Sequence, residues 1–199
     1  IMDYRPRLAS TTSFMYVLPI SDSEALIEYT FFSASLVDEE VYEEALVKYI
    51  RETLDIQQFE IWDTEQGIIP MTTYPFHHSS RKGLTKIGTA GSWVKGSSGY
   101  SFANAGRKVD QVIGNLKSGK SADHQLINPK FRYYDRLLLD VLYRNNDLGE
   151  SIFTHMYTRN SIQDIFKFLD EKTSVKTDFK IISTLNPWPF MAAMLRSLV

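Results

Sequence analysis

The chain has 199 residues, of which 43% are hydrophobic and 23% are charged, as in a folded protein with one sizeable core or two smaller ones. A net charge of −2 and the lack of cysteine argue against a nucleic-acid partner, exclude disulfides and thiolate metal sites, and fit a reducing cytosol. The aromatic content of 13% suits either an aromatic core or a large flat apolar ligand.

Two apolar segments near the N-terminus predict a β-hairpin. Residues 14–18 form a β-type run that ends at Pro19, a polar turn follows, and residues 25–33 predict the second strand. Both faces of this second strand are apolar, which predicts a central strand covered on both sides. Before the hairpin, Asp3 and Arg5 are expected to form a solvated ion pair.

Glu28 is the most informative acid in the sequence. Because side chains alternate along a strand, it shares a face with Leu26, Thr30 and Phe32. Burial among them would raise the pKa of the carboxyl and keep it protonated at neutral pH, as a general acid requires. A glutamate that simply reaches water or a neighbouring arginine is the alternative, and the residues alone leave both interpretations open.

The next segments predict packing elements and no metal site. Residues 38–54 predict a helix, with acidic residues at its start and an apolar stripe at helical spacing. Residues 59–63 alternate as in a strand, and Pro70 is expected to end the extended chain that follows. His77 and His78 are adjacent, so on an extended chain their side chains point to opposite sides and do not favour a shared metal.

A glycine-rich stretch follows at residues 87–102, after a short strand predicted to end at Ile87. Glycine permits positive φ and close approach of the backbone to a ligand, and amides at the start of the helix predicted over residues 102–116 can receive an anion. No standard phosphate-binding motif matches. A ligand-binding turn and a tightly packed strand-to-helix turn therefore both remain open.

Beyond Pro129 the apolar spacing becomes helical, and residues 186–190 lead into a short apolar helix that continues to Leu198. Trp, Phe and Met beside Arg196 in this last segment suit either a membrane surface or docking on the domain itself. No apolar run reaches transmembrane length and no signal peptide is recognised.

Four ordered segments together resemble the lycopene cyclase family. They are LP-x-S followed by ALIEYT, the IPM-T element at residues 69–72, GTAG-x-x-x-K-x-S-S-GY-x-F at residues 88–102, and helical segments at 136–143 and 165–173 that are similar to bacterial cyclases. The chain departs from the family pattern at Ile20, at Tyr29 in place of a second acid, at Gly96 in place of proline and at Ser98 in place of threonine.

The resemblance implies an α+β fold that is part of an α/β flavoprotein. The implied regions are a mixed-sheet substrate-binding region at residues 1–85, the last strand and helix of an FAD-binding domain at 86–120, and a helical C-terminal subdomain at 121–199. The family's N-terminal dinucleotide-binding unit is not recognised in the sequence. We therefore expect a piece of a longer protein, inactive and poor at binding flavin by itself.

The implied activity is the closure of the ends of lycopene, an acyclic carotene, into β-rings, with no net oxidation. The resemblance assigns the essential acid to Glu28 and implies reduced FAD, with NAD(P)H as electron source. The residues expected to bind the flavin are Gly88, Thr89, Ala90, Gly91, Lys95, Ser98, Gly99 and Tyr100. The aromatic residues expected to contact the substrate are Tyr16, Tyr29, Phe31 and Phe32.

The expected location is cytoplasmic, on the inner face of the membrane, with no nucleic-acid or metal partner. Two other functions remain open on the sequence. One is a different flavoenzyme of the same fold, such as an FAD-dependent isoprenoid reductase or a monooxygenase. The other is a non-catalytic lipid-binding module.

Overall fold

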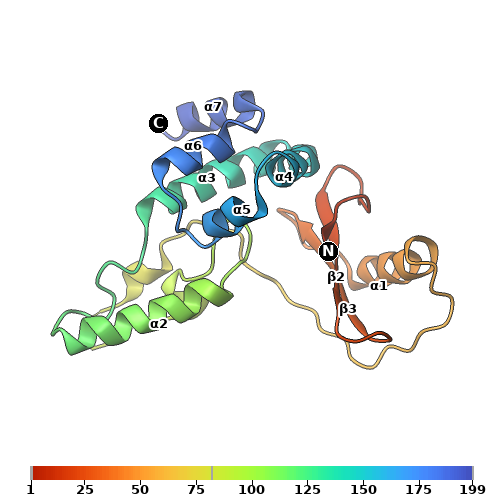
Figure 1. Ribbon diagram of the computed structural model, residues 1–199, viewed down its shortest axis with the longest axis horizontal. Helices are drawn as coiled ribbons and strands as arrows, with labels where there is room; N and C mark the ends of the chain where they lie inside the picture. The colour runs from red at the N-terminus through yellow and green to blue at the C-terminus, as the bar shows by residue number, and fades with distance from the viewer. Residues whose placement is uncertain (1, 82, 199) are drawn as a thin grey trace. The chain divides into compact units, whose positions relative to one another are not determined.

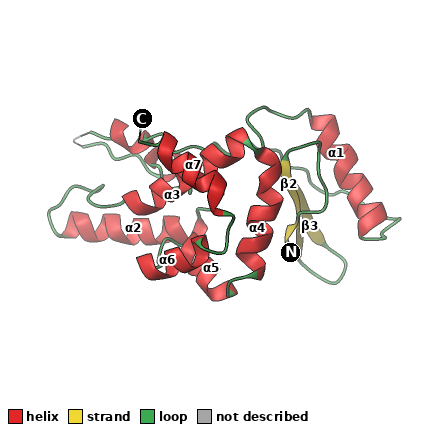
Figure 2. Cartoon of the chain, turned by 90° about the horizontal axis from the view of Figure 1, so that it is seen from above, coloured by secondary structure: helices red, strands yellow, loops and turns green. Residues whose placement is uncertain are grey.

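The computed structural model describes residues 2–81 and 83–198, which form a mixed α+β fold (Figure 1). The chain divides into two compact units, the first made of Ile1–Ile68 with Leu142–Ser151 and the second of Ile69–Val141 with Ile152–Val199. The strands belong to the first unit, whereas the second is mainly helical (Figure 2). The α+β class is thus confirmed in outline, and the three functional regions expected from the sequence stay a prediction.

The first unit is built on a three-stranded antiparallel sheet in the order β1 (Met2–Asp3), β2 (Thr12–Pro19) and β3 (Ala25–Phe32). The predicted hairpin is confirmed, with Tyr16 of β2 directly opposite Glu28 of β3. The predicted central position of the second strand is wrong, because β3 lies at the edge of the sheet in the described part of the chain. After β3 the chain forms a helix rather than another paired strand.

Helix α1 (Glu39–Lys48) continues into a π-helical turn, η1 (Tyr49–Thr53), and together they confirm the helix predicted there. Met15, Tyr29 and Tyr49 form the buried centre of the core between this helix and one face of the sheet. Partly buried apolar residues pack around that centre: Val17, Ile27, Phe31, Tyr42, Ala45, Leu46 and Leu54. The alternation of β2 and β3 and the helical stripe of α1 therefore meet as complementary apolar surfaces.

Asp3 anchors the first strand to this core. Its carboxylate accepts hydrogen bonds from the Arg5 side chain at 2.9 Å (Nε) and 2.5 Å (Nη2), and from the Tyr49 hydroxyl at 3.0 Å. The Arg5 hydrogen bonds lower the pKa of Asp3 to about 2, although burial acts in the opposite direction. The ion pair was expected to be solvated, but only one of its partners is. The Arg5 side chain is 77% exposed, whereas that of Asp3 is 9% exposed.

We expect Asp3→Asn to lower the free energy of unfolding of the full-length protein by about 1–2 kcal/mol at pH 7, because the folded state lowers the pKa of this carboxyl. Solvation of the Arg5 partner keeps the expected loss small. The stabilisation is present above the unfolded pKa near 4 and is lost as pH falls towards 2. Denaturant titrations at pH 7 and pH 3 should therefore show a smaller difference at the lower pH. Asp22→Asn, in the exposed β2–β3 turn, is the control. An equal loss at both pH values would contradict the role of this charge.

The remaining elements are short 3-10 turns and α-helices. They are η2 (Phe76–Ser79), η3 (Gly88–Gly91), α2 (Phe102–Lys117), α3 (Pro129–Arg144), η4 (Asn146–Leu148), α4 (Gly149–Thr158), α5 (Ile162–Leu169), α6 (Val175–Ile182) and α7 (Pro187–Arg196). The helix predicted over 102–116 and the helical C-terminal part are confirmed. The strands predicted at 59–63 and before Gly88 are wrong, because neither segment finds a strand to pair with in the described residues, and an unpaired strand leaves its backbone groups unsatisfied.

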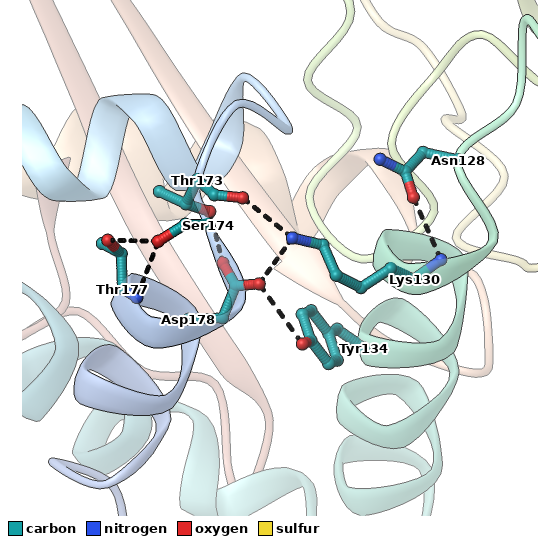
Figure 3. A network of polar contacts seen from close by, with 7 residues as sticks. All are labelled: Asn128, Lys130, Tyr134, Thr173, Ser174, Thr177 and Asp178. Atoms are coloured by element: carbon teal, nitrogen blue, oxygen red, sulfur yellow. Dashed lines mark hydrogen bonds and ion pairs between the residues drawn. The ribbon is translucent and has the colours of Figure 1, made fainter.

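A buried carboxylate joins α3 to α6 in the second unit (Figure 3). Asp178, which is 1% exposed, accepts hydrogen bonds from Lys130 at 2.6 Å, from the Tyr134 hydroxyl at 3.3 Å and from the Thr173 hydroxyl. Lys130 also donates to the Thr173 carbonyl oxygen at 2.8 Å. The charge of Asp178 is therefore compensated within the protein, and we assign this network a structural role.

Candidate functional site

Glu28 lies at the exposed end of a partly aromatic face of the hairpin, whose other end, at Phe14 and Phe32, is buried. The same face carries Phe14, Tyr16 and Phe32, and the ring of Phe14 lies 6.5 Å from that of Tyr16 and 5.9 Å from that of Phe32. The predicted burial of Glu28 is wrong, because this end of the edge strand is not covered in the described residues and the side chain is exposed. The Thr30 hydroxyl donates a hydrogen bond of 2.6 Å to the Glu28 carboxylate and fixes its orientation.

The structure separates the four aromatic residues that were predicted to contact the substrate. Tyr16 and Phe32 lie on the Glu28 face, whereas Tyr29 and Phe31 lie on the opposite face and pack against α1. The ring of Phe31 lies 4.8 Å from that of Tyr42 on α1. Tyr16 therefore remains a candidate for contact with a ligand beside Glu28. Phe32 is only 9% exposed and packs against Phe14, and Tyr29 and Phe31 serve the core.

The glycine-rich stretch combines close packing with open backbone. A Cβ atom at Gly91 would lie 2.4 Å from the Lys86 carbonyl oxygen, and one at Gly96 would lie 2.5 Å from the Thr72 carbonyl oxygen. These two positions need glycine because the chain packs on itself there. Gly88 has a φ of +58° and open space around it, so its backbone is accessible to a ligand. The tightly packed turn is thus confirmed at Gly91 and Gly96, whereas ligand binding by the stretch stays a prediction.

Lys95 is held by a buried ion pair. Its ammonium lies 2.5 Å from the carboxylate of Asp135 on α3, and the Ser97 hydroxyl donates to the same carboxylate at 2.6 Å. Lys95 and Asp135 are 3% and 4% exposed. The rings of Phe131 and Phe168 lie 5.6 and 5.8 Å from the ammonium. Lys95 therefore fastens the glycine-rich stretch to α3, and its ammonium is already occupied by a carboxylate of the protein.

A narrow cavity of about 30 Å³ lies next to this ion pair, with room for roughly two waters or one small oxyanion. Its walls come from the IPM-T element, the glycine-rich stretch, α2, α3 and the turn after α5. The polar side chains in these walls are Thr72, Thr73, Thr89, Ser92, Lys108, Asn128, Arg132, Asp135 and Glu171. Thr89 is the member of the predicted flavin-binding set that lines the cavity.

Two cations in these walls form no ion pair with a described residue. Lys108 is 9% exposed and makes no hydrogen bond or ion pair with a described residue, and its burial lowers its pKa. Arg132 donates to the Thr73 carbonyl oxygen but forms no ion pair in the described part of the chain. Burial raises the pKa of Glu171, a cavity carboxyl that attracts Lys95 and Lys108 but forms no ion pair with a described residue. The cavity thus has an excess of positive charge.

Metal ligation and membrane crossing find no support in residues 2–81 and 83–198. No three potential metal-ligating side chains gather at one place there, and the His77 ring instead lies 3.1 Å from the Ser92 hydroxyl. None of the described helices has the length and apolarity needed to cross a bilayer.

Comparison with known proteins assigns the chain to a family. The family model described as "Lycopene cyclase protein" matches residues 1–198. The chain belongs to this family. No curated protein and no solved structure gives a significant match. The resemblance found in four separate segments is confirmed, and it supports a carotenoid cyclase-like function for the chain.

In this member of the lycopene cyclase family, two of the segments that carried the resemblance lie against each other. The Thr72 carbonyl of the IPM-T element approaches Gly96 of the glycine-rich stretch, and Arg132 holds the adjacent Thr73 carbonyl. The sequence reasoning missed Asp135, Arg132 and Lys108. For Lys108 the sequence does offer a signal, because the helical spacing places Asn104, Lys108 and Asn115 on one face of α2. The structure buries this polar face, whereas apolar side chains of the same helix, such as Phe102 at 90%, are exposed.

Proposed function

We propose that the protein closes the ends of an acyclic carotene such as lycopene into β-rings and that Glu28 donates the initiating proton. The observation that carries this proposal is a carboxyl group on an exposed apolar face of a lycopene cyclase-family chain. Leu18 and Leu26 extend that face beyond Tyr16 and are 40% and 51% exposed. A polyene lying across it would exclude water from Glu28, which favours the neutral, protonated carboxyl that a general acid needs.

The reaction conserves atoms and electrons. The Glu28 proton adds to the terminal carbon–carbon double bond and leaves a tertiary carbocation. An internal double bond attacks that cation and forms the carbon–carbon bond that closes the ring. Loss of a proton from a neighbouring carbon then restores a double bond, so the product is an isomer of the substrate. The face of the Tyr16 ring, directly across the hairpin from Glu28, can stabilise the passing cation.

We also propose that the glycine-rich stretch contributes to a site for reduced FAD, with NAD(P)H as electron source. The residues fit an anionic cofactor, since Lys108 and Arg132 supply unpaired positive charge and Gly88 leaves its backbone open. The cavity is too small for a flavin ring, and the exposed Thr89 and Ala90 are residues of the stretch that would contact the ring outside it. When bound, the reduced flavin would supply electron density that stabilises a carbocation.

A peripheral membrane position is a further part of the proposal. Helix α7 exposes Trp188 at 73% and Leu195 at 68%, and Leu198 just after it is 81% exposed. Phe179 on α6 adds another exposed ring at 73%. Large exposed apolar side chains of this kind insert favourably at a bilayer surface, where a carotene substrate is dissolved.

The test is pigment analysis in bacterial cells that accumulate lycopene and express the full-length protein. The proposal predicts β-carotene or the one-ring precursor in the chromatogram. Unchanged lycopene together with flavin-dependent consumption of NAD(P)H would instead support an isoprenoid reductase or a monooxygenase. Unchanged lycopene with no turnover of a nicotinamide cofactor, but with retained carotene binding, would support a lipid-binding module.

A further inference from the structure

The small cavity in the second unit is lined by a cation that forms no ion pair with a described residue. The Lys108 side chain reaches it from the middle of α2 and is nine-tenths buried without a partner among the described residues. Burial disfavours the charged ammonium, and the attraction of Glu171 offsets this only in part, so the pKa of Lys108 is lowered. A buried, unpaired cation that lines a polar cavity is therefore explained most directly by a ligand of opposite charge.

The other charges around the cavity leave room for such a ligand. Lys95 and Asp135 neutralise each other, and Arg107 pairs with Asp170 at 3.4 Å. Arg132 and Lys108 then face a single unpaired carboxyl, that of Glu171. Hydroxyl groups of Thr72, Thr89 and Ser92 line the same cavity and can donate hydrogen bonds. Two cations and several hydroxyl donors around a space of about 30 Å³ suit a tetrahedral oxyanion.

We propose that this cavity binds a phosphate-type oxyanion, with Lys108 and Arg132 as its cationic ligands and Glu171 as a carboxylate that weakens binding. The oxyanion is either the diphosphate of a dinucleotide cofactor or a free phosphate-type ligand. Only the first source rests on the proposed flavin site. Loss of Lys108 and loss of Glu171 should change affinity in opposite directions, which a merely structural role for these residues would not produce.

The experiment uses the full-length protein and inorganic pyrophosphate as the probe, of which one phosphoryl group would occupy the cavity. Pyrophosphate is expected to raise the melting temperature, because a ligand of the folded state stabilises it by mass action. Lys108→Met should weaken its apparent affinity by about tenfold or more, Lys108→Arg should restore most of it, and Glu171→Gln should tighten binding several-fold. Lys117→Met, at the exposed end of the same helix, is the control. Binding that is unchanged in both the Lys108→Met and the Glu171→Gln variants would overturn the proposal, and so would the lack of any effect of pyrophosphate on the parent.

Flavin binding distinguishes the two sources of the oxyanion. If the diphosphate of FAD occupies the cavity, FAD displaces pyrophosphate, and Lys108→Met weakens binding of FAD more than that of riboflavin, which has no phosphate. If pyrophosphate binds and FAD does not displace it, the site takes a free phosphate-type ligand. Ring formation from lycopene is measured separately, so an unresponsive cavity in an active cyclase would refute this inference and leave the proposed function standing.

Discussion

Replacing Lys95 with methionine is expected to lower the free energy of unfolding by about 3–5 kcal/mol, the usual cost of removing one partner from a buried ion pair. The methionine would fill the space between the Phe131 and Phe168 rings, but the Asp135 carboxylate would remain buried with only the Ser97 hydroxyl as a donor. Denaturant unfolding of the full-length protein measures the loss. Trp93, which is 4% exposed and lies two residues before Lys95, provides a local fluorescence signal.

Two comparisons separate the charge from the packing. Lys120→Met, at an exposed position after α2, should change stability by less than about 0.5 kcal/mol. Adding Asp135→Asn to Lys95→Met should recover at least half of the loss, because the neutral amide can still accept the Ser97 hydrogen bond. A Lys95→Met protein as stable as the Lys120→Met protein would show that the pair does not hold the glycine-rich stretch to α3.

Replacing Glu28 with glutamine is expected to reduce β-ring formation by at least about 100-fold, the lower end of what a general acid contributes. Stability should change by less than about 0.5 kcal/mol, because the side chain is exposed and its hydrogen bond with the described residues is the one that Thr30 donates. The assay is the rate at which purified full-length protein with its cofactors converts lycopene, read by chromatography.

Glu24→Gln is the matched control for Glu28, since Glu24 is an exposed acid in the turn before the same strand. It should retain the parent rate. If the Glu28→Gln protein also retained that rate while remaining folded, the initiating acid would have to lie elsewhere. A Glu28→Asp protein should keep partial activity, because it preserves the acid and shortens its reach.

Local pattern predicted most of the regular structure. The alternating runs on either side of Pro19 gave the hairpin, and the apolar stripe after Asp38 gave α1, because these signals depend on residues close in sequence. The segment at 59–63 shows the limit of that reasoning. Its alternation is typical of a strand, but a strand also needs a neighbour, and no described strand lies beside it.

The site was harder to predict because its charges come from distant parts of the chain. Glu28 was identified from a local motif, yet its exposure depends on β3 being an edge strand, which the sequence of the hairpin does not reveal. Asp135 lies 40 residues from Lys95, and nothing in the spacing of either residue indicates the other. Asp135 lies between Phe131 and Leu137, which are both buried, and an acid in such a position indicates a buried hydrogen-bond or ion-pair partner. Which residue that partner is can be seen only in the folded structure.

The central claim is that a protein acid starts ring closure, and cyclisation in deuterated water tests it most directly. A carboxyl such as that of Glu28 exchanges its proton with solvent, so each new ring should carry one deuterium on carbon, detected as a mass increase in the extracted carotene. The expected result is one deuterium per ring with the parent and almost no ring product with Glu28→Gln. Rings formed in deuterated water without any deuterium would contradict the account.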